Sequence, residues 1–263
     1  MNKRQSNSLL RALHAATIVI LFGIGVGACA DLPGIGGTTW KEEALQHDGS
    51  KLVVTRSVKH GGLHEIGQEP PYKEQSLQFS MPTTGKSVKW EDHYSQELGA
   101  ANFLPMLVDV KDDAPYLVAY PMGCLSYNKW GRPNPPYVIF KYQGKEWNRI
   151  PLGELPAEIR TPNIIFSMPD VEVQKSGKNF ISAEMVRQII ERYRQPEFKT
   201  VLREGISNAG GDRCGEMVGN GKGDWIGIGS FRDKPSLDAC MSYCARHDFS
   251  AQYCPCNTLF KGK

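Results

Sequence analysis

Hydrophobic and polar residues alternate in several short runs along the middle of the chain, which is the pattern of half-buried β-strands. After an opening run at residues 51–58, three longer stretches follow at residues 76–91, 103–120 and 137–152. Each of the three is interrupted by a few turn-forming polar residues, and this arrangement predicts a β-hairpin. Three consecutive hairpins predict an antiparallel β meander, folded as a sandwich or as a partial barrel.

Beyond about residue 170 the spacing of apolar residues changes from two to between three and four. The segment SAEMVRQIIERYRQP at residues 182–196 begins at a serine cap, carries one apolar face and ends before a proline, so it predicts a helix. The segment SLDACMSYCARH at residues 236–247 also carries an apolar stripe and predicts a second helix. The predicted fold class is therefore α+β, with an antiparallel β domain at 51–170 and a smaller, cysteine-rich α and loop unit at 171–263.

The first residues have the organisation of a secretory signal peptide. Three basic residues precede an apolar run at residues 15–28, whose 14 residues are too few for the roughly 20 that a membrane-spanning helix needs. The Val-Gly-Ala-Cys at residues 26–29 resembles the lipobox of bacterial lipoprotein precursors. The resemblance implies cleavage of residues 1–28 and a lipidated Cys29 as the first mature residue. The alternative is ordinary secretory cleavage after Ala30, which would release a protein without that cysteine.

A lipidated Cys29 would place the chain in the cell envelope. Acyl chains such as palmitate contribute about 0.8 kcal/mol of membrane affinity for each buried methylene. Residue 30 is alanine and not aspartate, which resembles the outer-membrane sorting choice of enterobacterial lipoproteins and predicts the periplasmic face of the outer membrane. Residues 29–50 are then expected to form the lipidated N-terminus and a tether.

The charge of the chain resides mostly in the predicted signal peptide. Its removal takes away three of the 31 basic residues and none of the 28 acidic ones, so the mature chain has no net charge. A neutral chain lacks the positive footprint that supplies non-specific affinity for phosphate backbones. Nucleic acid is therefore not an expected partner.

Six cysteines remain besides Cys29, and an even number favours disulfides in an oxidising compartment. They are Cys124, Cys214, Cys240, Cys244, Cys254 and Cys256. Cysteines four residues apart on a helix have Cβ atoms about 5–6 Å apart, too far for a disulfide, so Cys240 and Cys244 should not pair with each other. Cys254 and Cys256 point to opposite sides if that segment is extended. We expect the helix cysteines to be joined to the 254–256 segment or to Cys214.

A zinc site is the alternative use of the C-terminal cysteines. Its ligands would be Cys240, Cys244, Cys254 and Cys256, with His247 as a further candidate. The spacing C-x3-C-x9-C-x-C lacks the close C-x2-C pairs of common structural zinc sites. No C-x-x-C motif of a thiol redox catalyst occurs in the chain. The expectation is therefore no cofactor, with zinc as the alternative.

The segment PMGCLSYNKWGRPNPPYVIF at residues 121–140 joins two predicted strands and mixes aromatic with polar side chains. Tyr127, Trp130, Arg132 and Tyr137 are the candidates for binding a partner, because such side chains are enriched where proteins hold other molecules. Three prolines would stiffen this loop and reduce the entropy lost on binding. The alternative is that the aromatic side chains simply cover the sheet.

No motif in the chain selects a catalytic residue. The glycine-rich region at 205–231 matches neither a phosphate-binding loop nor a nucleophile elbow, and turns explain it. The sequence therefore favours a non-catalytic envelope lipoprotein, an anchored binding or scaffold module for a protein or for peptidoglycan. The alternative is an envelope hydrolase or a thiol- or zinc-dependent enzyme.

Overall fold

The computed structural model describes residues 37–62, 64, 66–207 and 214–261. The predicted signal peptide and the lipidation site at Cys29 lie outside the described residues. None of the helices that the structure describes is both long enough and apolar enough to cross a membrane.

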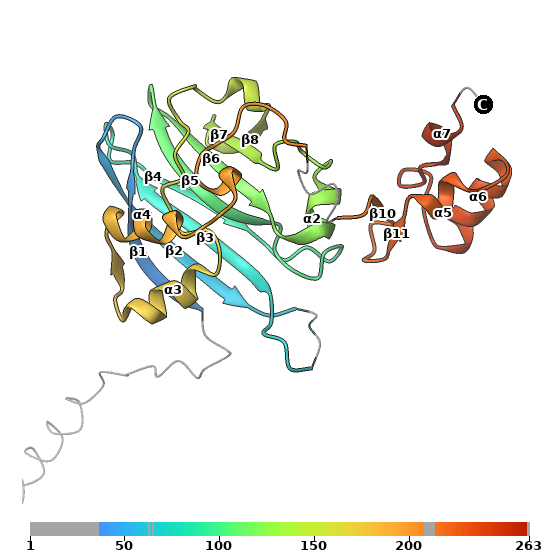
Figure 1. The fold of residues 1–263 in the computed structure, drawn as a ribbon, viewed down its shortest axis with the longest axis horizontal. Coiled ribbons are helices and arrows are strands. Elements are labelled where there is room, and N and C mark those ends of the chain that lie inside the picture. The colour runs from blue at the N-terminus through green and yellow to red at the C-terminus, as the bar shows by residue number, and fades with distance from the viewer. Residues whose placement is uncertain (1–36, 63, 65, 208–213, 262–263) are drawn as a thin grey trace, which may run out of the picture. The chain divides into compact units, whose positions relative to one another are not determined.

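Two open β-sheets contain nine of the eleven strands in the part of the chain that the structure describes (Figure 1). The first has the order β4-β3-β2-β1-β9 and the second the order β5-β6-β7-β8. The first sheet consists of β1 (Thr38–Leu45), β2 (Lys51–His60), β3 (Tyr72–Ser80), β4 (Ser87–Asp92) and β9 (Phe180–Ile181). The second consists of β5 (Phe103–Lys111), β6 (Ala114–Pro121), β7 (Val138–Gln143) and β8 (Glu146–Ile150). All pairings are antiparallel except that of β9 with β1.

The three predicted hairpins are β3–β4, β5–β6 and β7–β8, and the predicted α+β fold class with an antiparallel meander is confirmed. Both sheets contribute to one buried core, as a sandwich requires. Leu77 and Trp90 come to this core from the first sheet, and Leu117 and Phe140 come from the second. Alternate residues are buried along β2 and β4, as their sequence pattern predicts, whereas β5 and β6 are buried almost continuously because both of their faces are covered.

Short helices and loops cover the remaining apolar surfaces of the sheets. The helices of this part are α2 (Gly123–Lys129), α3 (Pro169–Ser176) and α4 (Ala183–Glu191). Helix α4 begins after Ser182, whose side chain accepts a hydrogen bond from the backbone N–H of Met185, so the helix predicted there is confirmed. Helices α3 and α4 contact β1 (Figure 1), and Val186 and Ile190 of α4 are buried with Trp40 of that strand.

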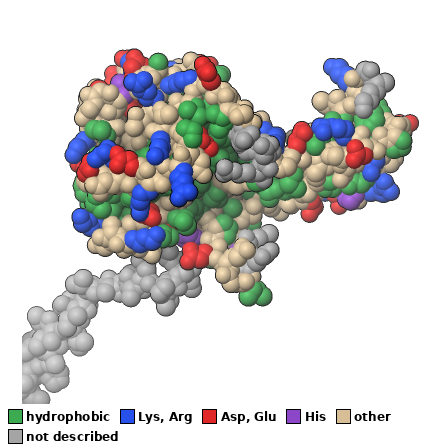
Figure 2. All heavy atoms as spheres, viewed as in Figure 1, with side chains coloured by type: hydrophobic (Ala, Val, Ile, Leu, Met, Phe, Trp, Pro, Cys, Tyr) green, Lys and Arg blue, Asp and Glu red, His purple; other side chains and the backbone are tan. Residues whose placement is uncertain are grey.

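The C-terminal residues form a small unit with its own core. It contains the hairpin of β10 (Met217–Gly219) and β11 (Trp225–Gly227), and the helices α5 (Gly229–Arg232), α6 (Leu237–Arg246) and α7 (Cys256–Leu259). Helix α6 is the predicted cysteine-bearing helix, capped by the side chain of Ser236. Phe231 and Phe249 pack against the cysteines at its centre. On the face drawn in Figure 2, side chains of both charge signs are interspersed over the described surface.

Two segments differ from expectation. Residues 38–45, expected to belong to a tether, form β1, which lies between β2 and the short β9 in the first sheet. The inward side of β1 carries the buried Glu42, and this charge hides the apolar alternation that marks the other strands. Glu42 is compensated by Arg56 of β2, whose guanidinium donates to its carboxylate over 2.8 Å.

Residues 171–203, expected in the C-terminal unit, instead pack on the sandwich through α3, α4 and β9.

Candidate functional site

The two sheets meet where β5, an edge strand of the second sheet, lies beside the end of β1 that β9 does not cover. Two amide side chains, those of Gln46 and Asn163, bridge this boundary, which we call the seam. Asn163 Nδ2 donates to the carbonyls of Leu45, at 3.0 Å, and of Val108, at 2.8 Å, while its Oδ1 accepts from the Val108 N–H at 3.0 Å. Gln46 Oε1 accepts from the Val110 N–H at 2.9 Å, and its Nε2 donates to the Val108 carbonyl at 3.2 Å. These side chains satisfy backbone groups that a missing neighbour strand would otherwise leave unpaired.

A histidine and an aspartate extend the same seam. The backbone N–H of His47 donates to Asp109 Oδ2 at 2.9 Å, and its ring Nδ1 donates to Asp109 Oδ1 at 2.7 Å. Asp109 is only 3% exposed; this burial raises the pKa of its carboxyl, although the hydrogen bonds from His47 act to lower it. Because Nδ1 carries the shared proton, Nε2 of a neutral His47 is a free acceptor. No described residue forms a hydrogen bond with Nε2.

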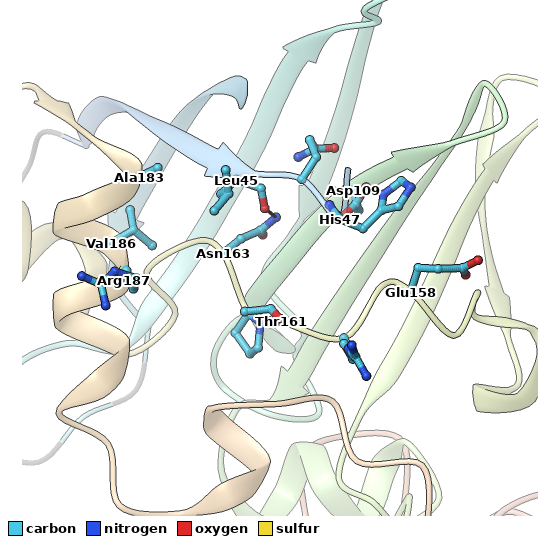
Figure 3. A pocket seen from close by; sticks show the side chains of 12 residues that line it. Leu45, His47, Asp109, Glu158, Thr161, Asn163, Ala183, Val186 and Arg187 are labelled. Atoms are coloured by element: carbon cyan, nitrogen blue, oxygen red, sulfur yellow. Dashed lines mark hydrogen bonds and ion pairs between the residues drawn. The ribbon is translucent and has the colours of Figure 1, made fainter. Parts of the chain in front are cut away.

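A cavity of ≈ 420 Å³, which we call the seam cavity, lies beside this seam (Figure 3). Ala183, Val186 and Arg187 of α4 line one side of it, and His47 and Asp109 line the other. The segment 158–163 runs between these two sides. The volume is within the range of small-molecule and short-peptide sites, and strand ends and a helix hold its walls in place.

The lining of the seam cavity is divided into an apolar part and a charged part. Leu45 is 47% exposed at the end of β1 and lies with Ala183 and Val186 at the apolar part. The charged or ionisable lining residues are His47, Asp109, Glu158 and Arg160, together with Arg187 beside Ala183 and Val186 on α4. Such a lining accommodates a molecule that is apolar at one end and ionic at the other.

Most charged groups of the seam cavity already have ionic partners. Glu158 is 3.4 Å from the ammonium of Lys111, and Arg187 is bound by two carboxylates of its own helix. Asp109 is bound by His47. Among the described residues no ion pair or hydrogen bond engages the guanidinium of Arg160, which is exposed. The cavity therefore presents one uncompensated positive charge.

The seam cavity contains some, but not all, of the groups that a hydrolytic active site uses. An imidazole oriented by a carboxylate is the usual arrangement of a general base. A covalent mechanism would also need a hydroxyl or thiol within about 2.6–3.2 Å of the imidazole. Among the described lining residues only Thr161 carries a hydroxyl, and no hydrogen bond joins it to His47. The arrangement supports binding, or the activation of a water molecule, better than nucleophilic catalysis.

The four residues expected to bind a partner do not form an exposed patch. Tyr127 and Tyr137 are buried, and the Tyr137 hydroxyl donates to a backbone carbonyl of the segment that covers the second sheet. Trp130 is partly buried against Phe103, with ring centroids 4.6 Å apart. Arg132 lies over the ring of Tyr127, 5.1 Å from its centroid. This corrects the expectation of an exposed binding loop and favours the alternative in which these side chains cover the sheet.

The described cysteines form three pairs at disulfide distance. They are Cys124–Cys214, Cys240–Cys256 and Cys244–Cys254, with Cα atoms 5.1, 5.8 and 5.8 Å apart. Of the two partners expected for the helix cysteines, the 254–256 segment and Cys214, the segment is the one that lies at disulfide distance from them. The Sγ atoms of Cys244, Cys254 and Cys256 also lie within 4.8 Å of one another, so the zinc alternative for the reduced chain stays a prediction.

The sequence carried little signal for the seam cavity. His47 lies in the segment expected to be a tether, and Asp109 lies 62 residues later, near the end of the apolar strand β5. A charged residue inside such a strand is the one available hint, because a buried carboxylate needs a partner. Comparison of the chain with protein-family models, with curated proteins and with solved structures finds no match.

Proposed function

We propose that this chain is a non-catalytic binding module of the bacterial cell envelope, anchored through acyl chains on Cys29. The partner is an envelope protein or peptidoglycan, and the seam cavity is the surface that holds it. The observation that carries the proposal is this cavity, in which an exposed apolar side chain and an unpaired guanidinium line one preformed hollow. The lipobox-like residues 26–29 support the anchor and the envelope location.

The anchor is tested with two substitutions in the predicted first mature residues. Cys29→Ser should move the protein out of membrane fractions and remove acyl mass from the intact chain. Ala30→Asp keeps the lipidated cysteine and should change only the membrane in which the protein is found. Membrane retention of the Cys29→Ser protein, without acyl mass, would refute the anchor.

The seam cavity is tested by retention of the purified protein on peptidoglycan sacculi. Leu45→Asp and Arg160→Glu each alter one end of the cavity and should reduce retention. Val53→Asp is the matched control, because Val53 is 45% exposed in the same sheet but does not line the seam cavity. Sacculi that retain all three variants as well as the unchanged protein would exclude this cavity as their binding site, and cross-linking from position 45 in cells would then examine protein partners.

A hydrolase is the second candidate, favoured by the His47–Asp109 pair alone. In that function His47 Nε2 would take a proton from a water molecule, while Asp109 would hold the imidazole and stabilise its charged form. His47→Gln should then abolish release of soluble fragments from sacculi and leave the far-ultraviolet circular dichroism unchanged. Absence of any release by the unchanged protein supports the binding module.

A further inference from the structure

We infer that the seam cavity recognises the free carboxyl terminus of a peptide that ends in a small apolar residue. This inference rests on the proposed binding function and adds the chemical class of the ligand. It is carried by the meeting of three features at one hollow: the unpaired Arg160, the oriented His47 and the short apolar wall at Leu45 and Val186.

The charge of the ligand follows from the charges that line the seam cavity. Glu158, Asp109 and Arg187 are each compensated by a protein group, which leaves the guanidinium of Arg160 to be neutralised from outside. A guanidinium presents its N–H groups as a planar fork, and a carboxylate accepts two of them in parallel. An anion with two coplanar oxygens therefore fits Arg160 better than a neutral group does.

His47 supplies a second contact for the same anion. Its Nδ1–H is already directed at Asp109, so only Nε2 can address a ligand. With both ring nitrogens protonated, Nε2–H is a donor that a carboxylate oxygen can accept. Arg160 and His47 both line the seam cavity, and together they would hold a carboxylate.

The apolar part of the seam cavity limits what the carboxylate can be attached to. Leu45, Ala183 and Val186 offer a wall of three short aliphatic side chains, enough for a methyl or a branched side chain. The rest of the lining is mostly polar or charged and includes Thr161, Glu158 and Arg160, so a long acyl chain would find little further apolar surface. Burying apolar surface against such groups brings little gain, whereas the backbone of a peptide can hydrogen-bond there. A peptide terminus is therefore favoured over a fatty acid.

The experiment is a calorimetric titration of the full chain with two probes that differ at one group. N-acetyl-Lys-Ala-Ala with a free carboxylate is compared with the same peptide ending in a carboxamide. Loss of a charge-assisted hydrogen bond costs about 1.5–3 kcal/mol, so the amide should bind about 10 to 150 times more weakly. Arg160→Gln should remove this difference between the two peptides, and Arg160→Lys should restore part of it.

Arg194→Gln is the matched control, because it removes another exposed arginine that does not line the seam cavity. Equal binding of the acid and the amide, or no binding of either, overturns the inference about the carboxylate. The retention of the unchanged protein on sacculi measures the proposed function separately. Sacculi whose carboxylates have been converted to amides should retain less protein if cell-wall peptides are the source; unchanged retention, with the acid peptide still preferred, assigns the carboxylate to a protein terminus.

Discussion

Asn163 joins the two sheets where they meet, and its replacement tests this account of the seam. Asn163→Ala removes the donor to the Leu45 and Val108 carbonyls and the acceptor for the Val108 N–H. The Val108 carbonyl keeps its hydrogen bond from Gln46, at 3.2 Å. Two backbone groups are therefore left without a protein partner, the N–H of Val108 and the carbonyl of Leu45.

The size of the effect follows from these two groups. A buried polar group without a partner costs about 1–3 kcal/mol. The neighbouring seam cavity admits water to this region, so the lower half of that range applies to each group, and Asn163→Ala should lower the free energy of unfolding by about 2–4 kcal/mol. Asn163→Asp has the same shape, but it directs a carboxylate oxygen at two carbonyl oxygens. Its cost should equal or exceed that of the alanine variant.

The assay is equilibrium urea unfolding with the disulfides intact. Both variants should lower the midpoint while the dependence on urea concentration stays the same. Asn148→Ala is the control, because the Asn148 amide makes only a long, exposed contact, at 3.4 Å, with the Glu146 carbonyl; it should change stability by less than about 0.5 kcal/mol. A loss below about 0.5 kcal/mol for Asn163→Ala, or a smaller loss for Asn163→Asp than for Asn163→Ala, would refute the reasoning.

Three further predictions concern other parts of the chain. Burial lowers the pKa of His60, but hydrogen bonds to a backbone carbonyl and to Asp170 raise it more, to a net value above 6.5. The charged form of His60 therefore stabilises the fold, fully below pH 6.5 and no longer once the pH has risen through the folded pKa. Chemical unfolding at several pH values should show the free energy of unfolding decline over this range, and His60→Asn should flatten that decline. Tyr127→Ala should cost about 3 kcal/mol in urea unfolding, because the ring is buried; a normal midpoint combined with lost binding would restore its role as a contact residue. Replacing both Cys124 and Cys214 by serine opens a crosslink between residues 90 apart and should cost about 2–4 kcal/mol, and an unchanged midpoint under oxidising conditions would contradict the pairing.

Local sequence patterns predict the hairpins and two of the helices of this protein. Each predicted hairpin has its turn residues between two alternating runs, and each of the two predicted helices has a serine cap before its apolar face. The spacing of Cys240 and Cys244 on a helix also excludes a disulfide between them, in agreement with the pairs in the structure, although it does not choose their partners. Local geometry suffices for these features, since residues within one or two turns decide them.

Local patterns do not show which side chains the fold buries, or which buried charges it pairs between different strands. The sequence pattern does not predict β1, because Glu42 faces the core and its partner Arg56 comes from the next strand. The mixture of aromatic and polar residues near 130 predicts a binding surface, although these side chains cover the sheet, because a sequence does not show which side of a segment another layer covers.

The candidate site shows the same division most clearly. His47 and Asp109 are 62 residues apart in the chain and meet only because the first sheet packs on the second along the seam. Residue types, periods and caps specify the strands and helices one by one. Which polar groups must share a desolvated space, and which charge is left over for a ligand, depends on the packing of distant segments against one another.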